Sequence, residues 1–171
     1  MERSKKILFV SHCILNNNTR AEIDTGKYTH IVDEVVNLAK KHGIGLEQIP
    51  CPEFEKLGCP REGRTKTQYE NLEGFREICS QIAEHVAEQI EKFQKAGYRI
   101  YGVVGIKRSP SCSSTDVYLG PNQKERRLVK GNGIFVEELK KRVNIPFIDW
   151  DHKDISGSLK NLEKSRLSCI W

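Results

Sequence analysis

The chain has 171 residues, of which 37% are hydrophobic and 30% charged, a balance that is typical of a globular domain and excludes an extensively disordered chain. The 28 Lys and Arg residues exceed the 23 Asp and Glu residues, giving a formal net charge of +5 and a mildly basic surface. No apolar run approaches the roughly 20 residues of a membrane-spanning helix, and the run over 7–10 is too short for a signal peptide, so we expect a cytoplasmic protein without a membrane partner.

The first part of the chain alternates between the two regular structures. Residues 5–11 form a short run of apolar, β-branched and aromatic residues that predicts a buried strand. Apolar residues at helical spacing predict a helix over 29–41, and Gly43 is a stop signal just beyond it. A second strand is predicted over 44–49, where prolines follow at 50 and 52.

The same alternation continues to the end of the chain. Residues 68–96 carry the clearest helical stripe, which Gly74 can divide into two helices. The remaining predicted elements are a strand over 98–106, a helix over 133–143, a strand over 145–149 and a helix over 156–167. Strands that alternate with helices predict one α/β domain over 1–171, a three-layer α/β/α sandwich around a mostly parallel four-stranded sheet. The expected topology is flavodoxin- or Rossmann-like, with strand order 2-1-3-4.

Three cysteines follow three of the predicted strands. Cys13 lies just after the first strand, Cys51 just after the second, and Cys112 in the loop that leaves the third. Parallel strands all point the same way, so their following loops open on one edge of the sheet, which is where ligands sit in doubly wound folds. Topology alone therefore predicts that these three thiols share a site.

The other three cysteines are interpreted differently. Cys79 lies on the helical stripe and is expected to pack in the core, Cys169 is expected to be structural or exposed, and Cys59 remains ambiguous as a spare thiol. A disulfide framework is not expected in a cytosolic protein. The chain has no C-x-x-C pair, which argues against a zinc knuckle or a thioredoxin-type motif.

The three thiols alone do not determine which metal ion or cluster they bind. Structural zinc sites use four protein ligands, and the sequence offers no obvious fourth. An iron–sulfur cluster binds thiolates readily, and with three of them it keeps one iron open for a substrate. Thiolate softness suits either metal.

Four segments give the chain a specific resemblance to a known family. They are VSHCIL at 10–15, PCPE at 50–53, KRSPSC at 107–112 and KGNGIF at 130–135. In combination these segments resemble the thiouracil desulfurase family and its related desulfidases, over about residues 7 to 150. The chain departs from the family's pattern at His12, at Ser113 and in the stretch 55–68. These departures leave the assignment of the three cysteines unchanged and concern the identity of the substrate.

The resemblance implies a cofactor and a reaction. A [4Fe–4S] cluster would be held by Cys13, Cys51 and Cys112, and water would replace sulfur on a small thiocarbonyl substrate such as thiouracil. A thiolated RNA is the less favoured substrate. The resemblance places the catalytic glutamate at Glu47 and a catalytic serine at Ser109. The side chains expected to contact the substrate are Ser11, His12, Arg20 and Ser111.

The assignment of Glu47 carries a geometric condition. If residues 47–51 were fully extended, Glu47 and Cys51 would be about 13 Å apart. The prolines at 50 and 52 must therefore bend the chain to bring this carboxylate to the cysteines. Independently of the family, a carboxylate beside such a centre can deprotonate water and protonate a leaving group.

Three other functions stay open at this point. A low-molecular-weight type of cysteine phosphatase also has its thiolate after the first strand, but it needs one residue fewer than the six that separate Cys13 from Arg20. A metal or redox sensor could use the same three thiolates without catalysis. A basic module binding nucleic acid could use Arg61, Arg64 and Lys66, although such a run of charges is more often a solvated face.

Overall fold

The computed structural model describes residues 2–22 and 28–168. Its main sheet contains four parallel strands in the order β2-β1-β3-β6. The strands are β1 (Lys6–Ser11), β2 (Gly45–Ile49), β3 (Arg99–Ile106) and β6 (Phe147–Trp150). Because β6 is the fourth strand of this sheet, the predicted order 2-1-3-4 is confirmed, and so is the α/β class.

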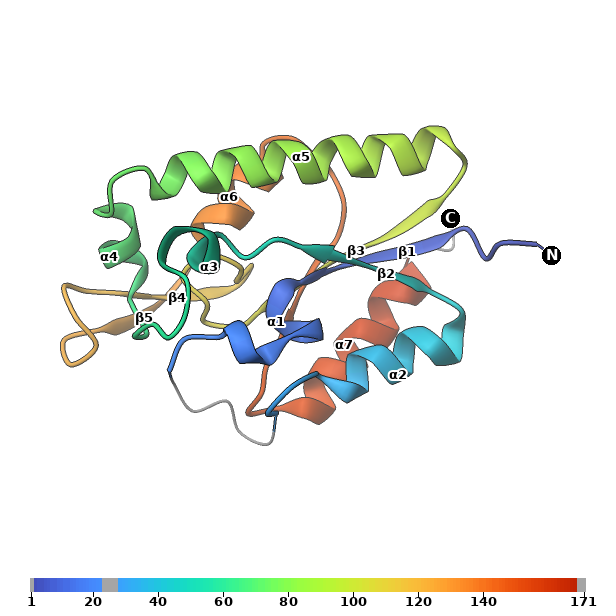
Figure 1. Cartoon of the computed structure of the whole chain (residues 1–171). Coiled ribbons are helices and arrows are strands. Elements are labelled where there is room, and N and C mark those ends of the chain that lie inside the picture. Colours follow the sequence, from blue (N-terminus) through green and yellow to red (C-terminus); the bar gives the residue numbers. More distant parts are fainter. Residues whose placement is uncertain (1, 23–27, 169–171) are drawn as a thin grey trace.

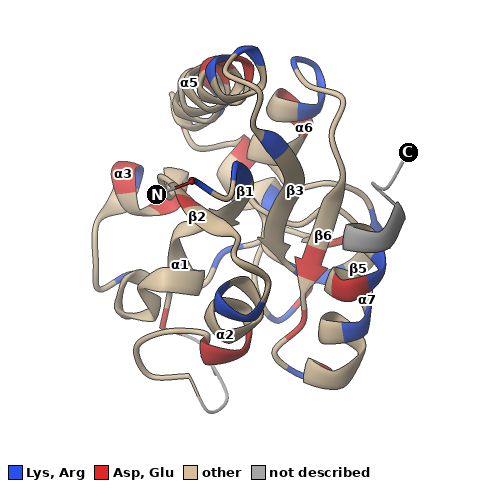
Figure 2. Ribbon diagram, turned by 90° about the vertical axis from the view of Figure 1, so that its right-hand side faces the viewer, with Lys and Arg blue, Asp and Glu red and all other residues tan. Residues whose placement is uncertain are grey.

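Helices cover both faces of the sheet. In Figure 2 the strands run across the view in the order β2, β1, β3, β6, with α5 (Phe75–Lys95) and α6 (Ile134–Lys140) above them. Helices α2 (Asp33–His42) and α7 (Ile155–Ser168) lie below. Each face has its own apolar core, one beneath α5 and α6 and the other beneath α2 and α7. The three-layer arrangement is the predicted one.

The long helix forms where the sequence pattern places it, but it is divided. Gly74 has a left-handed φ of 73° and separates α4 (Lys66–Glu70) from α5. Thr65 starts α4 with a capping box, in which its side chain and that of Gln68 each bond the other's backbone N–H. The face of α5 that packs on the sheet is fully buried at Phe75, Cys79, Ala83 and Val86.

Several elements were not predicted. They are the short helix α1 (His12–Leu15), the 3-10 turn η1 (Asn17–Thr19), the helix α3 (Pro52–Leu57) and an antiparallel hairpin of β4 (Asp116–Leu119) and β5 (Arg127–Lys130). Each is short, and β5 is mostly exposed, so none produces a sustained apolar period. Figure 1 shows that α1, α3 and the hairpin gather near the end of the sheet opposite to the N-terminus, where the parallel strands finish.

The described helices carry no membrane-spanning segment, since none of them is both long and apolar enough. Lys and Arg are interspersed with Asp and Glu over the helices (Figure 2). The charge pattern is that of solvated helix faces rather than of one strongly basic surface.

Candidate cysteine site

The three predicted thiols all lie at the carboxyl edge of the sheet. β1 leads directly into α1, which carries Cys13, and Cys51 is the residue immediately before α3. Cys112 lies in the loop that follows β3. Each thiol acts electrostatically on another of the three, because Cys51 raises the pKa of Cys13, Cys112 raises that of Cys51, and Cys13 raises that of Cys112. The ends of β1, β2 and β3 therefore place all three cysteines at the same edge of the sheet.

Burial keeps these thiols in their neutral form. It is the main cause that raises the pKa of Cys13, Cys51 and Cys112 to about 12 each. Positive and hydroxyl groups oppose the effect, namely Arg20 at Cys13, Arg61 at Cys51, and Ser111 and Ser11 at Cys112. Thiolates are the form that binds metal, so loading a metal here must displace the thiol protons.

Two glycines allow the backbone to pass close to the Cys112 loop. A Cβ on Gly105 would collide with the carbonyl oxygen of Cys112, and one on Gly133 would collide with the carbonyl group of Ser111. The amide of Gly133 donates to the Ser113 carbonyl (2.7 Å), and that of Ile134 donates to the Pro110 carbonyl (2.9 Å). The start of α6 thus binds the loop that carries Cys112, which explains the glycine before this helix.

Gly133→Ala is expected to destabilise the protein by about 1–3 kcal/mol, because the new methyl group must push the Ser111 backbone away from α6. Gly131→Ala is a matched control, since its Cβ would meet only the Val117 side chain at an ordinary 3.6 Å. Urea unfolding of the two variants measures the difference. Equal stability of both variants would contradict the close approach at Gly133.

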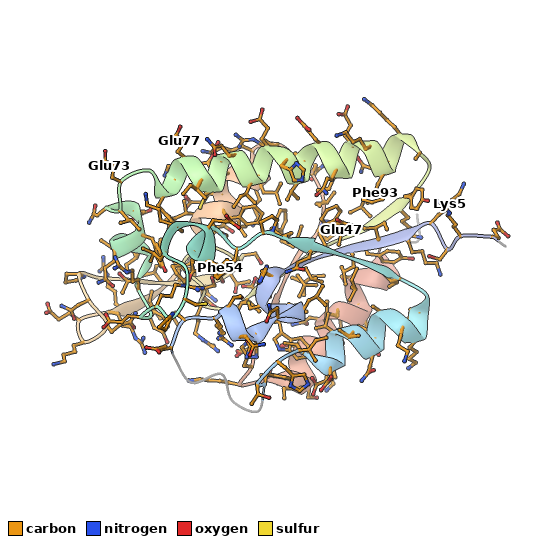
Figure 3. All side chains as sticks on the ribbon, viewed as in Figure 1. Lys5, Glu47, Phe54, Glu73, Glu77 and Phe93 are labelled. Atoms are coloured by element: carbon orange, nitrogen blue, oxygen red, sulfur yellow. The ribbon has the colours of Figure 1, made fainter. Side chains whose placement is uncertain are left out.

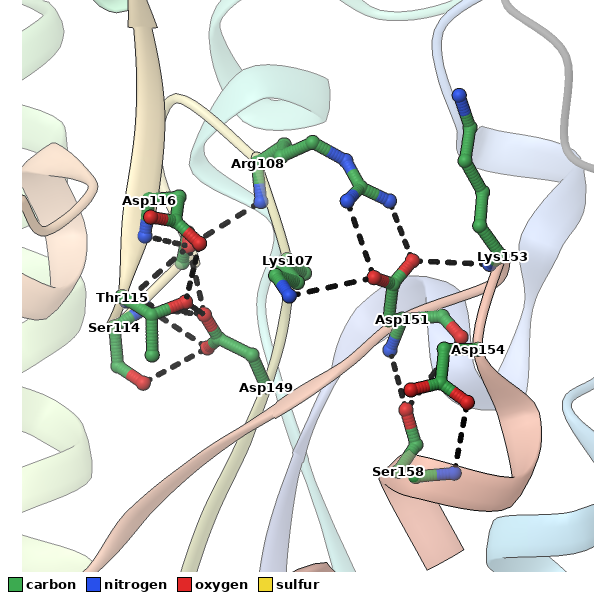
Figure 4. Close-up of polar contacts among 12 residues, drawn as sticks. Lys107, Arg108, Ser114, Thr115, Asp116, Asp149, Asp151, Lys153, Asp154 and Ser158 are labelled. Carbon is green, nitrogen blue, oxygen red and sulfur yellow. Dashed lines mark hydrogen bonds and ion pairs between the residues drawn. The ribbon is translucent and has the colours of Figure 1, made fainter. Parts of the chain in front are cut away.

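Two aspartates at the end of β6 fix the same loop from its other side (Figure 4). Asp149 accepts hydrogen bonds from the hydroxyls of Ser113 (2.8 Å), Ser114 (2.9 Å) and Thr115 (2.7 Å). Asp151 accepts two hydrogen bonds from the guanidinium of Arg108, which has a left-handed φ of 67°. The segment with Ser109, Ser111 and Cys112 is therefore held at both of its ends.

A buried glutamate stands among the site residues. Glu53, in the first turn of α3, is 8% exposed. One of its carboxylate oxygens accepts hydrogen bonds from the Ser111 hydroxyl (2.6 Å) and the Ser109 hydroxyl (3.5 Å). The other accepts one from the Tyr69 hydroxyl (3.2 Å) and forms an ion pair with Arg61 (3.5 Å). Glu53 connects the segment after β2 to the segment after β3.

Glu47 lies elsewhere. It is in the middle of β2, paired in register with Phe9 of β1, and Figure 3 shows it on the body of the strand rather than on α3. β2 stays extended to Ile49, so the bend that the assignment required begins only after the strand. Among the described residues, no hydrogen bond or ion pair joins Glu47 to a cysteine. Its catalytic role remains a prediction that the geometry of the site does not support.

The missed glutamate had a signal in the sequence. Proline is favoured at the first position of a helix, and acidic residues are favoured in the first turn. Pro52 and Glu53 fulfil both preferences directly after Cys51. A helix that begins there turns the chain back at the end of β2, and this places the residue after Pro52 beside Cys51.

The other predicted site residues fall around the thiols. Ser109 accepts hydrogen bonds from the backbone amides of Ser111 and Cys112 (3.3 and 3.0 Å), so it also shapes the loop. Ser11 is buried at the end of β1 and acts to lower the pKa of the Cys112 thiol. His12 stacks on Phe54 and contacts Gln48 through Nδ1. Arg20 is half-buried and acts on Cys13 by its charge.

The basic residues that could have formed a nucleic-acid surface are largely internal. Arg61 and Lys66 are each 8% exposed, and Lys66 pairs with Glu70 and Glu137. Arg61 contacts Glu53 and the Cys51 sulfur. The interpretation of these two residues as an anion-binding face is wrong, because their charges are compensated inside the protein.

The remaining cysteines differ from the three at the sheet edge. Cys79 is fully buried in the core on α5, as predicted, and Cys59 is an exposed free thiol. Cys169 lies outside the described residues. All five described cysteines are free thiols.

The donor set fits an iron–sulfur cluster, which takes cysteine thiolates as its ligands. Within residues 2–22 and 28–168, no three His, Cys, Asp or Glu side chains are placed to share one metal ion. Zinc needs its ligands to converge on one point, whereas in a [4Fe–4S] cluster each cysteine binds a different iron, so the thiolates stand further apart. Free thiols at one edge of the sheet, with Cys112 buried and Cys13 and Cys51 half-buried, are ligands of the type that such a cluster takes.

A histidine near the site makes stability depend on pH. Burial, helped by Arg20, lowers the pKa of His152 to about 4, and both of its ring nitrogens are buried without a partner. In the unfolded chain a histidine has its ordinary pKa near 6.5. The free energy of unfolding should therefore fall as the pH drops from 6.5 toward 4, and the loss should be about 2 kcal/mol at pH 5. Urea unfolding at pH 7.5 and 5 measures this loss, which His152→Gln should reduce. An equal loss in that variant would exclude His152 as the cause.

The fold and the thiols define an α/β protein with a cysteine site at the carboxyl edge of its parallel sheet. The chain belongs to the 2-thiouracil desulfurase family, whose model matches residues 8–149. It is 33% identical over 175 residues to an uncharacterized protein of Methanocaldococcus jannaschii, covering 95% of this chain and 97% of that protein. The predicted family is confirmed.

A solved structure supports the fold. The chain resembles the [4Fe–4S]-dependent thiouracil desulfidase TudS with a TM-score of 0.58 and 17% sequence identity, over 93% of this chain and 99% of the other. At this identity the similarity is one of fold.

Proposed function

We propose that this protein is a [4Fe–4S]-dependent desulfidase, which removes sulfur from a small thiocarbonyl substrate, thiouracil or a related thiolated heterocycle. The observation that supports the proposal is the position of Cys13, Cys51 and Cys112 at one edge of the sheet, where the Ser111 hydroxyl lies near the Cys112 sulfur and donates to the buried Glu53 carboxylate. The family and the chemistry of the solved neighbour support it. The three thiolates would hold the cluster.

When bound, such a cluster supplies an iron without a protein ligand, a Lewis acid with high affinity for sulfur. The overall reaction is a hydrolysis without change of oxidation state. The C=S bond is replaced by a C=O bond whose oxygen comes from water, and the two water protons leave with the sulfide. The protein must therefore move protons between water and the leaving group.

Glu53 is placed to move these protons. Its carboxylate is buried beside Cys51, and the Ser111 hydroxyl that donates to it also lies 3.4 Å from the Cys112 sulfur. A carboxylate in this position can take a proton from the attacking water and return it to the departing group. Ser111 and Ser109 orient the carboxylate, so we propose Glu53 rather than Glu47 as the acid–base residue.

Anaerobic reconstitution with iron and sulfide tests the proposal. The expected result is a brown protein with about four irons per chain that converts 2-thiouracil to uracil and releases sulfide. Protein that takes up no iron would overturn the proposal. A stable cluster without turnover of any thiopyrimidine, thionucleoside or thioamide would favour the alternative of a sensor.

The surroundings of the site support the remaining parts of the proposal. All five described cysteines are free, which suits the reducing cytoplasm. We propose one catalytic domain over residues 1–171 and a small-molecule substrate rather than a thiolated RNA. The burial of Arg61 and Lys66 supports this preference.

A further inference from the structure

Arg61 is a buried cation that touches both a cysteine and the acid–base residue. Its side chain is 5% exposed, and its guanidinium lies 3.5 Å from the Glu53 carboxylate. The same group donates toward the Cys51 sulfur at 3.8 Å. It also donates to the backbone carbonyls of Thr19 and Gly58 (3.3 Å for Gly58). A charge this deep in the protein is costly unless its partners compensate it.

The partners of Arg61 belong to segments that border the site. Thr19 ends η1, the turn that follows the Cys13 helix, and Gly58 ends α3, which begins after Cys51. Burial alone would lower the pKa of Arg61, but Glu53, Cys51 and Tyr69 outweigh this effect and raise it above its ordinary value. The guanidinium is therefore a permanent positive charge beside the site.

The charges at the site explain what this cation can do. A [4Fe–4S]²⁺ core with three thiolates has a net charge of −1, and the Glu53 carboxylate adds another negative charge next to it. Reduction adds one more electron to this negative centre. The net charge around a cluster and the hydrogen bonds to its sulfurs set its reduction potential. A cation that donates to the Cys51 sulfur acts on both quantities.

We propose that Arg61 is a positioning residue that holds the Glu53 carboxylate against Cys51 and balances the negative charge of the cluster environment. The proposal rests on the proposed function, because it needs a cluster to be bound. It goes beyond that function in assigning a role to Arg61, a residue that the proposed reaction itself does not use.

Two substitutions separate the charge of Arg61 from its structural contacts. Arg61→Lys keeps the positive charge but loses the planar guanidinium group, and Arg61→Gln loses the charge. Neither side chain reproduces the set of guanidinium hydrogen bonds to the Thr19 and Gly58 carbonyls, so a purely structural role predicts a similar change in both variants. Arg142→Gln is a control, because Arg142 pairs with Glu138 and Ser80 and has no hydrogen bond or ion pair with Glu53 or with a cysteine in the part of the chain that the structure describes.

The readout is the reduction potential of the reconstituted cluster, followed by electron paramagnetic resonance during an anaerobic redox titration. At the wild-type midpoint, Arg61→Gln should lower the ratio of reduced to oxidised cluster at least tenfold, about 59 mV for one electron. Arg61→Lys should shift it much less, and the Arg142 control should not shift it. Glu53→Gln, which removes a negative charge, should shift the potential in the opposite direction.

The outcomes distinguish this inference from the proposed function. If the wild-type protein binds no cluster, the proposed function fails. The wild type can instead bind a cluster while Arg61→Gln and Arg61→Lys have the same reduction potential. In that case Arg61 has only a structural role, and the inference is overturned. Should Arg61→Gln fail to fold, the Glu53→Gln titration still decides, because a potential that stays at the wild-type value would contradict the electrostatic role of the pair.

Discussion

Glu53→Gln is expected to lower the rate of sulfide release from 2-thiouracil by roughly 100- to 10,000-fold, the usual contribution of a general acid–base residue. Glutamine keeps the volume of the side chain and an oxygen for the Ser111 hydroxyl, which lies 2.6 Å from the carboxylate. It cannot take a proton from water at neutral pH. The rate should therefore fall while the cysteines still bind iron.

The measurement combines steady-state kcat with the iron content of each preparation. Glu47→Gln is the matched control, since this glutamate belongs to β2 and has no hydrogen bond or ion pair with a cysteine among the described residues. We expect its kcat to stay near the wild-type value. Loss of activity in Glu47→Gln with full activity in Glu53→Gln would return the catalytic role to the position that the family resemblance implied.

The fold could be predicted because its central strands are strong local signals. β1 and β3 are apolar and nearly continuous runs, as expected for strands buried on both faces. Once these runs alternate with helical stripes, a parallel sheet is the expected arrangement. The hairpin of β4 and β5 was not predicted, because its strands have four residues each and lie mostly outside the core.

The position of the thiols was predictable for a related reason. A cysteine just beyond a parallel strand must lie at the carboxyl edge, whatever the loops do in detail. Which carboxylate joins the thiols depends instead on where a loop turns. Glu53 reaches Cys51 through the six-residue helix α3, which is too short to show a periodic pattern.

The burial of Arg61 depends on long-range packing in the same way. The sequence places it in a run of polar and basic residues, which usually means a solvated face. In the structure its partners come from residues distant in the chain, such as Thr19, as well as from nearby Glu53. Pairing of this kind needs the three-dimensional fold, so no local pattern could indicate it.

Substitution of any of the three edge cysteines by alanine should reduce bound iron at least about tenfold and abolish sulfide release. Each variant removes one thiolate from a set that has no spare, because the other described cysteines, Cys59 and Cys79, lie on the surface and in the core. The measurement is iron and sulfide per chain after anaerobic reconstitution, with circular dichroism to verify the fold.

Two matched controls make the cysteine series decisive. Cys59→Ala removes an exposed thiol and should keep full iron content and activity. Cys79→Ala removes a buried thiol and is expected to cost about 1 kcal/mol through the small cavity that it leaves, while the cluster remains. Cys79 is buried like Cys112 but lies on α5 rather than after a strand, so this variant separates lost packing from lost ligation. Loss of iron in Cys79→Ala, or its retention in Cys112→Ala, would show that the strand ends do not define the ligand set.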